Sequence, residues 1–263
     1  MKILSTNTLK VIAIIAMLCD HIPYLTEELK GHYYDSPWFL MHAFGRITAP
    51  VFFYLLALGY RRTRDVNAYT VRLLVFAVIS YVPYIWYFYF EAPGLANFYE
   101  FNVIFTMLVG LLLLRALREV KYIPLKVILI ALCFVCGYWC DYGLYGLAMI
   151  LVCDVARGSR GATVLGLMAV MITYVYVRLG NIFPGEAGPF EYLGIIAGNP
   201  RIVHLFVVLG CQVLPLILIA CHRVWDERGA AAERKPGFLA KYGFYVFYPA
   251  HISILWLVRY YII

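Results

Sequence analysis

The sequence has little charge. Only 14% of its 263 residues are Asp, Glu, Lys or Arg, whereas 63% are hydrophobic and the mean hydropathy is +0.79. Soluble domains carry about 25% charged and about 45–50% apolar residues. The composition therefore excludes an ordinary soluble domain, and long apolar runs recur along the whole length. We expect an all-α integral membrane protein that forms a single domain over residues 1–263.

Other features are lacking as well. Strict alternation of apolar and polar residues is absent, which argues against a membrane β-barrel. The seven cysteines lie almost entirely inside apolar runs, so neither a disulfide framework nor a metal site is expected. No internal repeat is visible, although many secondary transporters contain one. The first apolar run holds Asp20 and His21 and lacks a small-x-small cleavage site, so we interpret it as a mature span rather than a signal peptide.

What the sequence does contain is a series of apolar runs close to the length that crosses a bilayer, about 17–25 residues. We predict about nine transmembrane helices, at residues 9–25, 40–60, 69–90, 101–118, 123–140, 142–157, 160–179, 202–222 and 239–260. The Gly- and Pro-rich stretch 180–201 is expected to be a loop. Most of the 22 lysines and arginines fall on one set of alternate loops. The positive-inside rule then places the N-terminus in the cytoplasm and the C-terminus outside.

Several spans carry ionisable or amide side chains, which are costly inside a membrane and usually functional. At about 1.5 Å per helical residue, His21 and His251 each lie roughly 15–16 Å from the inner end of their spans, so we expect them at the same depth. Asp20 and His21 lie about 100° apart around a helix. We therefore expect Asp20 to bind a neighbouring helix while His21 faces a cavity. The same reasoning places four further polar side chains in the middle or outer half: His42, Arg46, Asn102 and Asp141.

These buried groups have two interpretations. In the first, they satisfy one another, for example as a pair between Arg46 and either Asp20 or Asp141. In the second, they line a site in which Arg46 and Asn102 donate hydrogen bonds to a carbonyl or an acceptor. His42 and Asp141 would join them as substrate-binding residues. Two His, two Asp, one Arg and one Asn at overlapping depth exceed what packing requires, which favours a site.

The second predicted helix ends in a basic cluster, Arg61, Arg62 and Arg64. One interpretation is a stop-transfer signal on the cytoplasmic side. The other is a binding site for a phosphate-rich cofactor that arrives from the cytosol, because guanidinium groups match phosphate geometry.

Five phrases in the sequence resemble the TraX family of bacterial membrane proteins. They are LKVIAIIAMLCDH (9–21), GRITAPVFFYLLALGYRRTR (45–64), NVIFTMLVG (102–110), DYGLYGLAMI (141–150) and KYGFYVFYPAH (241–251), in order over almost the entire chain. The family's namesake N-acetylates the pilin of a conjugative plasmid. The family is similar to multi-span acyltransferases that use cytosolic acetyl-CoA. The resemblance implies a multi-pass protein of the bacterial inner membrane, with His21 as the catalytic histidine.

The leading hypothesis is thus an acetyltransferase with acetyl-CoA as donor and an amine or hydroxyl acceptor, which is a protein N-terminus, a sugar or a small molecule. His21 is the expected general base, and Asp20 and His251 complete the catalytic set. His251 is a second base, a proton relay or a donor to the oxyanion. The bilayer is the other expected partner, no nucleic acid is expected, and a homodimer is left open. The alternatives are a proton-coupled transporter that uses Asp20, His21 and His251, and an assembly protein without chemistry.

Overall fold

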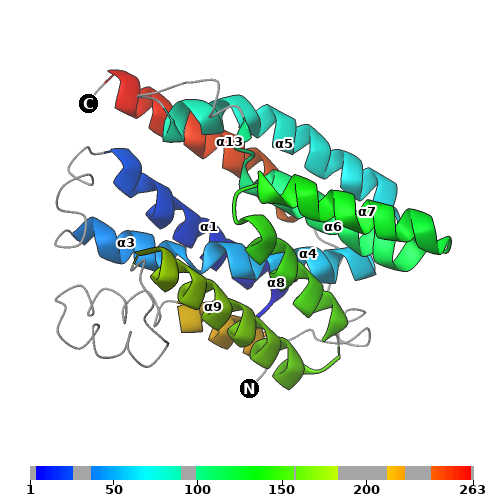
Figure 1. Cartoon of the computed structure of the whole chain (residues 1–263). Coiled ribbons are helices and arrows are strands. Elements are labelled where there is room, and N and C mark those ends of the chain that lie inside the picture. The colour runs from blue at the N-terminus through cyan, green and yellow to red at the C-terminus, as the bar shows by residue number, and fades with distance from the viewer. Residues whose placement is uncertain are drawn as a thin grey trace.

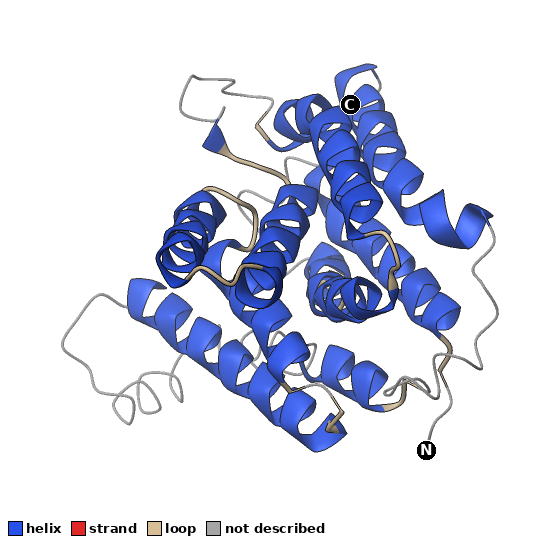
Figure 2. Ribbon diagram, turned by 90° about the vertical axis from the view of Figure 1, so that its right-hand side faces the viewer, coloured by secondary structure: helices blue, strands red, loops and turns tan. Residues whose placement is uncertain are grey.

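The computed structural model describes residues 4–25, 37–89, 99–156, 158–182, 212–222 and 238–261. Over these residues the regular structure is helical, with two isolated β-bridges and no strand (Figures 1 and 2). The helices are α1 (Thr6–His21), the 3-10 helix η1 (Ile22–Leu25), α3 (Pro37–Gly45), α4 (Thr48–Arg62), α5 (Val66–Phe88), α6 (Val103–Glu119), α7 (Ile123–Tyr138), α8 (Gly143–Val155), α9 (Arg160–Ile182) and α13 (Phe238–Tyr261). Residues 212–220 are helical as well. The all-α prediction is confirmed.

Each of the nine predicted spans contains a helix in the part that the structure describes. Among the described residues, four stretches are long and apolar enough to cross a membrane, namely Thr6–Leu25, Trp38–Arg62, Val66–Phe88 and Arg160–Val177. The apolar helices α7 and α8 are shorter. The chain therefore has the helices of a membrane protein, while the nine crossings and the placement of the two termini stay predictions. The segments 183–201 of the predicted loop and 202–211 of the eighth span lie outside the described residues.

Side-chain caps fix the starts of several helices. Ser5 accepts a hydrogen bond from the backbone N–H of Thr8 at 3.1 Å, and Asp65 accepts one from that of Ala68 at 2.8 Å. Such caps satisfy N–H groups in the first turn that lack a partner inside the helix. The first helix consequently begins at Thr6, a few residues before the predicted start.

The second predicted span, 40–60, is not one continuous helix. α3 ends at Gly45 and α4 begins at Thr48, with a turn between them. Pro50 explains the break. In the first turn of α4 its missing N–H does no harm, but in an unbroken helix its ring would clash with the carbonyl of Arg46 four residues earlier. The turn leaves Arg46 at a corner between the two helices.

α4 is the core of the bundle. Every residue from Ala49 to Leu58 is buried, and α1, α6 and α8 all pack against this helix. In contrast, α7 buries only Cys133 and Gly137 and exposes most of its apolar side chains. A helix that is apolar all round belongs in a core, whereas one with an exposed apolar face suits contact with lipid.

α13 lies alongside α5 (Figure 1). Aromatic pairs join the two helices, with ring centroids 5.2 Å apart for Phe76 and Tyr245 and 4.8 Å apart for Trp86 and Trp256. α1 also meets α13. The C-terminal end of α1 therefore lies next to the middle of α13, although the two helices are far apart in the sequence.

Candidate functional site: a histidine pair beside an ionic cluster

His21, the last residue of α1, contacts His251 in the middle of α13. Nδ1 of His21 lies 2.7 Å from Nε2 of His251, and the two ring planes differ by 6°. The two residues are 9% and 5% exposed. The prediction that both histidines share one depth is confirmed as a direct contact. Their catalytic roles stay predictions.

A backbone carbonyl determines where the hydrogens lie in the neutral histidine pair. Nδ1 of His251 is 2.8 Å from the carbonyl oxygen of Phe247, which only accepts, so this nitrogen carries a hydrogen. Nε2 of a neutral His251 is then an acceptor, and Nδ1 of His21 must donate to it. The free lone pair of His21 is consequently on Nε2. None of the described residues forms a hydrogen bond with that nitrogen.

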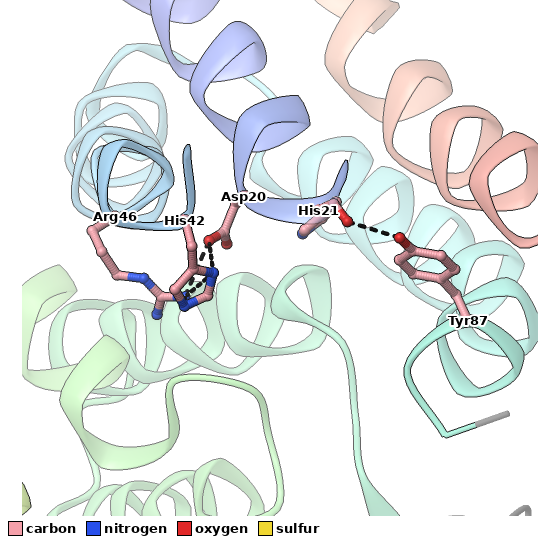
Figure 3. A network of polar contacts seen from close by, with 5 residues as sticks. All are labelled: Asp20, His21, His42, Arg46 and Tyr87. Atoms are coloured by element: carbon pink, nitrogen blue, oxygen red, sulfur yellow. Dashed lines mark hydrogen bonds and ion pairs between the residues drawn. The ribbon is translucent and has the colours of Figure 1, made fainter. Parts of the chain in front are cut away.

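Aromatic side chains surround the histidine pair. Phe88 and Tyr248 meet the His21 ring edge-on, with centroids 5.3 and 6.4 Å away. Phe247 stacks on His251 at 4.6 Å. The hydroxyl of Tyr87 donates to the backbone carbonyl of His21 at 2.7 Å (Figure 3). The pair thus lies in low-dielectric surroundings, where hydrogen bonds are electrostatically stronger than in water.

Asp20 belongs to a separate ionic cluster with His42 of α3 and Arg46 of the following turn (Figure 3). Its Oδ1 lies 2.8 Å from Nδ1 of His42 and 3.1 Å from Nη2 of Arg46. The same Arg46 nitrogen is 2.5 Å from Nε2 of His42. A neutral His42 that donates from Nδ1 accepts at Nε2, so it bridges the carboxylate and the guanidinium. The prediction that Asp20 binds a neighbouring helix is confirmed.

Gly45 allows α3 to approach α1 at the ionic cluster. A Cβ atom built at this position would lie 2.3 Å from Cβ of Asp20 and 2.7 Å from its Cα. Part of that obstruction is backbone, which cannot rotate away. Small residues serve the same purpose at other close helix contacts in membranes.

Asn102 lies at the start of α6. Its Oδ1 accepts from the backbone N–H of Ile104 at 3.0 Å, and its Nδ2 donates to the carbonyl of Ala77 in α5 at 3.0 Å. Backbone groups thus occupy both ends of the buried amide, which caps α6 and joins it to α5. No contact among the described residues links Asn102 to the histidine pair.

Asp141 lies in the tight turn between α7 and α8. Its Oδ1 accepts from the backbone N–H of Tyr142 at 2.9 Å, and its carbonyl accepts from the hydroxyl of Thr106. Tyr142 has a φ of 63°, a left-handed conformation that is unfavourable for a bulky residue. Its phenol and the Asp141 carboxylate are both within electrostatic range of Arg46. The turn therefore borders the ionic cluster.

The predicted basic cluster lies at the other end of α4. Arg61 donates to the carbonyls of Ala57 and Cys153 at 3.2 and 3.3 Å, so it also joins α4 to α8. Arg64 is exposed and Arg62 is partly buried. The three arginines are thus grouped at one end of α4, while Arg46 lies at the opposite end.

Two buried polar contacts were not predicted from the sequence. Arg118 of α6 binds Asp154 of α8 with Nη2 2.5 Å from Oδ2, and Asp154 is 4% exposed. His222 is fully buried, with Nδ1 2.8 Å from the hydroxyl of Tyr54 and Nε2 3.1 Å from that of Thr6. For Asp154 the sequence did hold a signal, because it is an acidic residue inside an apolar run. Nothing in the sequence around His222 indicates its partners.

Comparison with known proteins places the chain in a family. The TraX protein family matches residues 5–259. The chain belongs to the TraX family. It is also 30% identical, over 255 residues, to the probable fimbrial assembly protein FimC, serogroup H1, of Dichelobacter nodosus, which covers 95% of this chain and 94% of that protein. No solved structure matches the chain significantly. The resemblance found in the sequence is confirmed at the level of the family, and it extends to a relative named for fimbrial assembly.

Proposed function

We propose that this TraX-family protein is a membrane acetyltransferase that transfers acetyl from cytosolic acetyl-CoA to an amine or hydroxyl acceptor, with His21 as general base. The observation that carries the proposal is the free Nε2 lone pair of His21. It follows from the bond between the two histidines and from the bond of His251 to the Phe247 carbonyl. A base whose tautomer is already fixed does not have to reorganise during the reaction.

In the proposed reaction, Nε2 of His21 takes the proton of the acceptor N–H or O–H as that atom attacks the thioester carbonyl. The new N–C or O–C bond forms, the C–S bond breaks, and His21 returns the proton to the departing thiolate. Nδ1–H of His21 stays bonded to His251 throughout, which stabilises the imidazolium while it carries the extra charge. In this reaction, the ionic cluster of Asp20, His42 and Arg46 would line the part of the site that binds the acceptor.

The basic end of α4 supports a phosphate-bearing donor. Arg61, Arg62 and Arg160 all lie within electrostatic range of the Tyr54 hydroxyl, so cationic groups of α4 and α9 converge there. Guanidinium groups suit phosphates. Roughly 15 Å of depth separates this end from His21 at about 1.5 Å per residue. An extended pantetheine arm would cover that depth, with the phosphates held by Arg61, Arg62 and Arg64.

The relative named as a probable fimbrial assembly protein favours a pilus or fimbrial protein as acceptor. Such an acceptor is exported through the inner membrane of a bacterium, which is where we place this protein. The proposed orientation, with the N-terminus in the cytoplasm, puts the basic end of α4 on the side that holds acetyl-CoA.

Radiolabelled acetyl-CoA tests the proposal. Purified protein in detergent should bind and slowly hydrolyse it, and His21→Gln should lower the rate about 10²–10⁴-fold, the usual contribution of a general base. Ser80→Ala is the control, because that side chain is also buried but its hydroxyl donates to the carbonyl of Phe76 in its own helix. Absence of binding and turnover in the wild type, or an unchanged rate in His21→Gln, would contradict the proposal.

The second candidate, a proton-coupled transporter, rests on the same bond between His21 and His251, because linked histidines pass protons. The Phe247 carbonyl argues against it. It occupies the far nitrogen of His251 and has no proton to exchange, so a relay would end there. Proton flux into liposomes that disappears in His251→Phe would favour the transporter.

A further inference from the structure

We propose that Tyr87 is a positioning residue that sets the distance between His21 and His251. The effect on turnover rests on the proposed function, whereas the effect on the histidine pair does not. Tyr87 belongs to α5, which contributes no histidine to the pair. Its side chain is fully buried, and its hydroxyl donates to the backbone carbonyl of His21 at 2.7 Å (Figure 3).

The hydroxyl of Tyr87 holds the end of α1. His21 is the last residue of this helix, and the carbonyls of a final helical turn lack partners within the helix. The 3-10 helix η1 begins at the next residue, and the bond from Tyr87 adds a contact from α5 at this junction of α1 and η1. The bond from α5 thus fixes the atoms that carry the imidazole, rather than the imidazole itself.

The backbone of Tyr87 holds α13. Its carbonyl accepts a hydrogen bond from Nη1 of Arg259 at 3.1 Å, and Arg259 lies about two turns beyond His251 on the same helix. The neighbouring Trp86 packs on Trp256 of α13. A single residue of α5 is therefore bonded to both helices that supply an imidazole, through its side chain to one and through its backbone to the other.

The hydrogen bond between the two histidines is sensitive to small shifts of either helix. A nitrogen–nitrogen distance of 2.7 Å is at the short end for a hydrogen bond, and hydrogen bonds weaken steeply as distance and angle depart from their optimum. If the end of α1 moves away, Nδ1 of His21 loses its acceptor. The hydrogen then occupies either ring nitrogen, and the lone pair is no longer confined to Nε2.

Nitrogen-15 NMR of histidine-labelled full-length protein in detergent tests the proposal. The wild type should show a downfield Nδ1–H resonance of His21 with a coupling across the hydrogen bond to Nε2 of His251. The loss of both signals in His21→Gln and in His251→Phe assigns them. Tyr87→Phe should lose the coupling. Tyr84→Phe, the matched control one turn earlier on α5, should keep it, because that hydroxyl bonds to Tyr89 instead.

Turnover of acetyl-CoA supplies a second measurement. Tyr87→Phe should lower kcat roughly tenfold with an unchanged KM, because a misplaced catalytic group slows the reaction without weakening donor binding. If Tyr87→Phe does not fold, Arg259→Gln removes the other link and should weaken the same coupling. A coupling that persists in the folded variant, or is absent from the wild type, overturns the proposal. A coupling lost in Tyr87→Phe while wild-type protein leaves acetyl-CoA unchanged supports the positioning role and contradicts the proposed function.

Discussion

Asp20 and His21 are neighbours in the chain but belong to two polar groups of different character. The histidine pair is bonded without any carboxylate, ends on a backbone carbonyl and leaves one ring nitrogen free. In the ionic cluster, Asp20 and Arg46 form a direct ion pair, and His42 contacts both of them. The carboxylate next to His21 in the sequence therefore does not orient the His21 ring. A backbone carbonyl does so, through His251.

The largest expected effect concerns the ionic cluster. Asp20→Asn leaves the Arg46 guanidinium without its counter-charge, and removing one partner of a buried ion pair costs about 3–5 kcal/mol. Because the Arg46 side chain is 23% exposed, we expect the lower end of that range, measured as a fall in the thermal midpoint in detergent. The double variant Asp20→Asn with Arg46→Met should recover part of the loss. A stable Asp20→Asn protein that has lost only turnover would assign Asp20 to the histidine pair.

The second prediction concerns the helix contact that holds the ionic cluster. Gly45→Ala places a methyl group 2.3 Å from Cβ of Asp20, so the helices must separate. Overpacking of this kind costs about 1–3 kcal/mol. Gly243→Ala in α13 is the control, because no atom of the described residues outside its own stretch of helix lies within 4 Å of the added group and alanine favours the helix. Equal thermal midpoints for the two variants would show that the approach of α3 to α1 is not tight.

The third prediction breaks the histidine pair instead. His251→Phe keeps an aromatic ring in place but removes the acceptor for Nδ1 of His21. Turnover should fall about tenfold, which corresponds to about 1.4 kcal/mol in the barrier. That loss is smaller than for His21→Gln, because the base itself remains. Kinetics with radiolabelled acetyl-CoA provide the measurement, and a loss as large as that of His21→Gln would make His251 the base.

The smallest effect is expected at the turn beside the ionic cluster. The Tyr142 hydroxyl forms no hydrogen bond with a described residue, so Tyr142→Phe should change the stability by less than about 0.5 kcal/mol. Tyr87→Phe, in comparison, removes a bond worth about 1 kcal/mol. Thermal midpoints of both variants test the contrast. A large loss in Tyr142→Phe would show that its hydroxyl helps to hold the left-handed turn.

Much of the fold was predictable from the sequence, because apolar runs of spanning length mark helices whatever their neighbours. The contact between His21 and His251 could also be predicted from the sequence. Depth along a helix is a simple count of residues, and two costly groups at one depth tend to meet. For Arg46 the sequence left two partners open, Asp20 and Asp141, and the structure pairs it with Asp20. The catalytic and binding roles of these residues stay predictions.

The rest depends on information that residue counting does not contain. Depth places Asn102 near the histidines but gives no lateral position, and its amide bonds to Ala77 and Ile104 instead. Pro50 accounts for the break before α4. From the sequence alone, however, one continuous helix with a kink at Pro50 was an equally good prediction. Tyr87 was one of many tyrosines in an aromatic-rich span. Only its bonds to both α1 and α13 distinguish it.

The histidine pair joins positions 230 residues apart in the sequence. Such a contact forms late, because the chain between its partners must be ordered before they meet. The proposed base of this protein therefore acquires its fixed tautomer only when α13 has docked on α5 and α1. A partly synthesised or truncated chain has His21 but not the bond that orients it. The proposed acyl transfer at this site would accordingly require that α13 has docked, and its activity would report that the bundle has assembled.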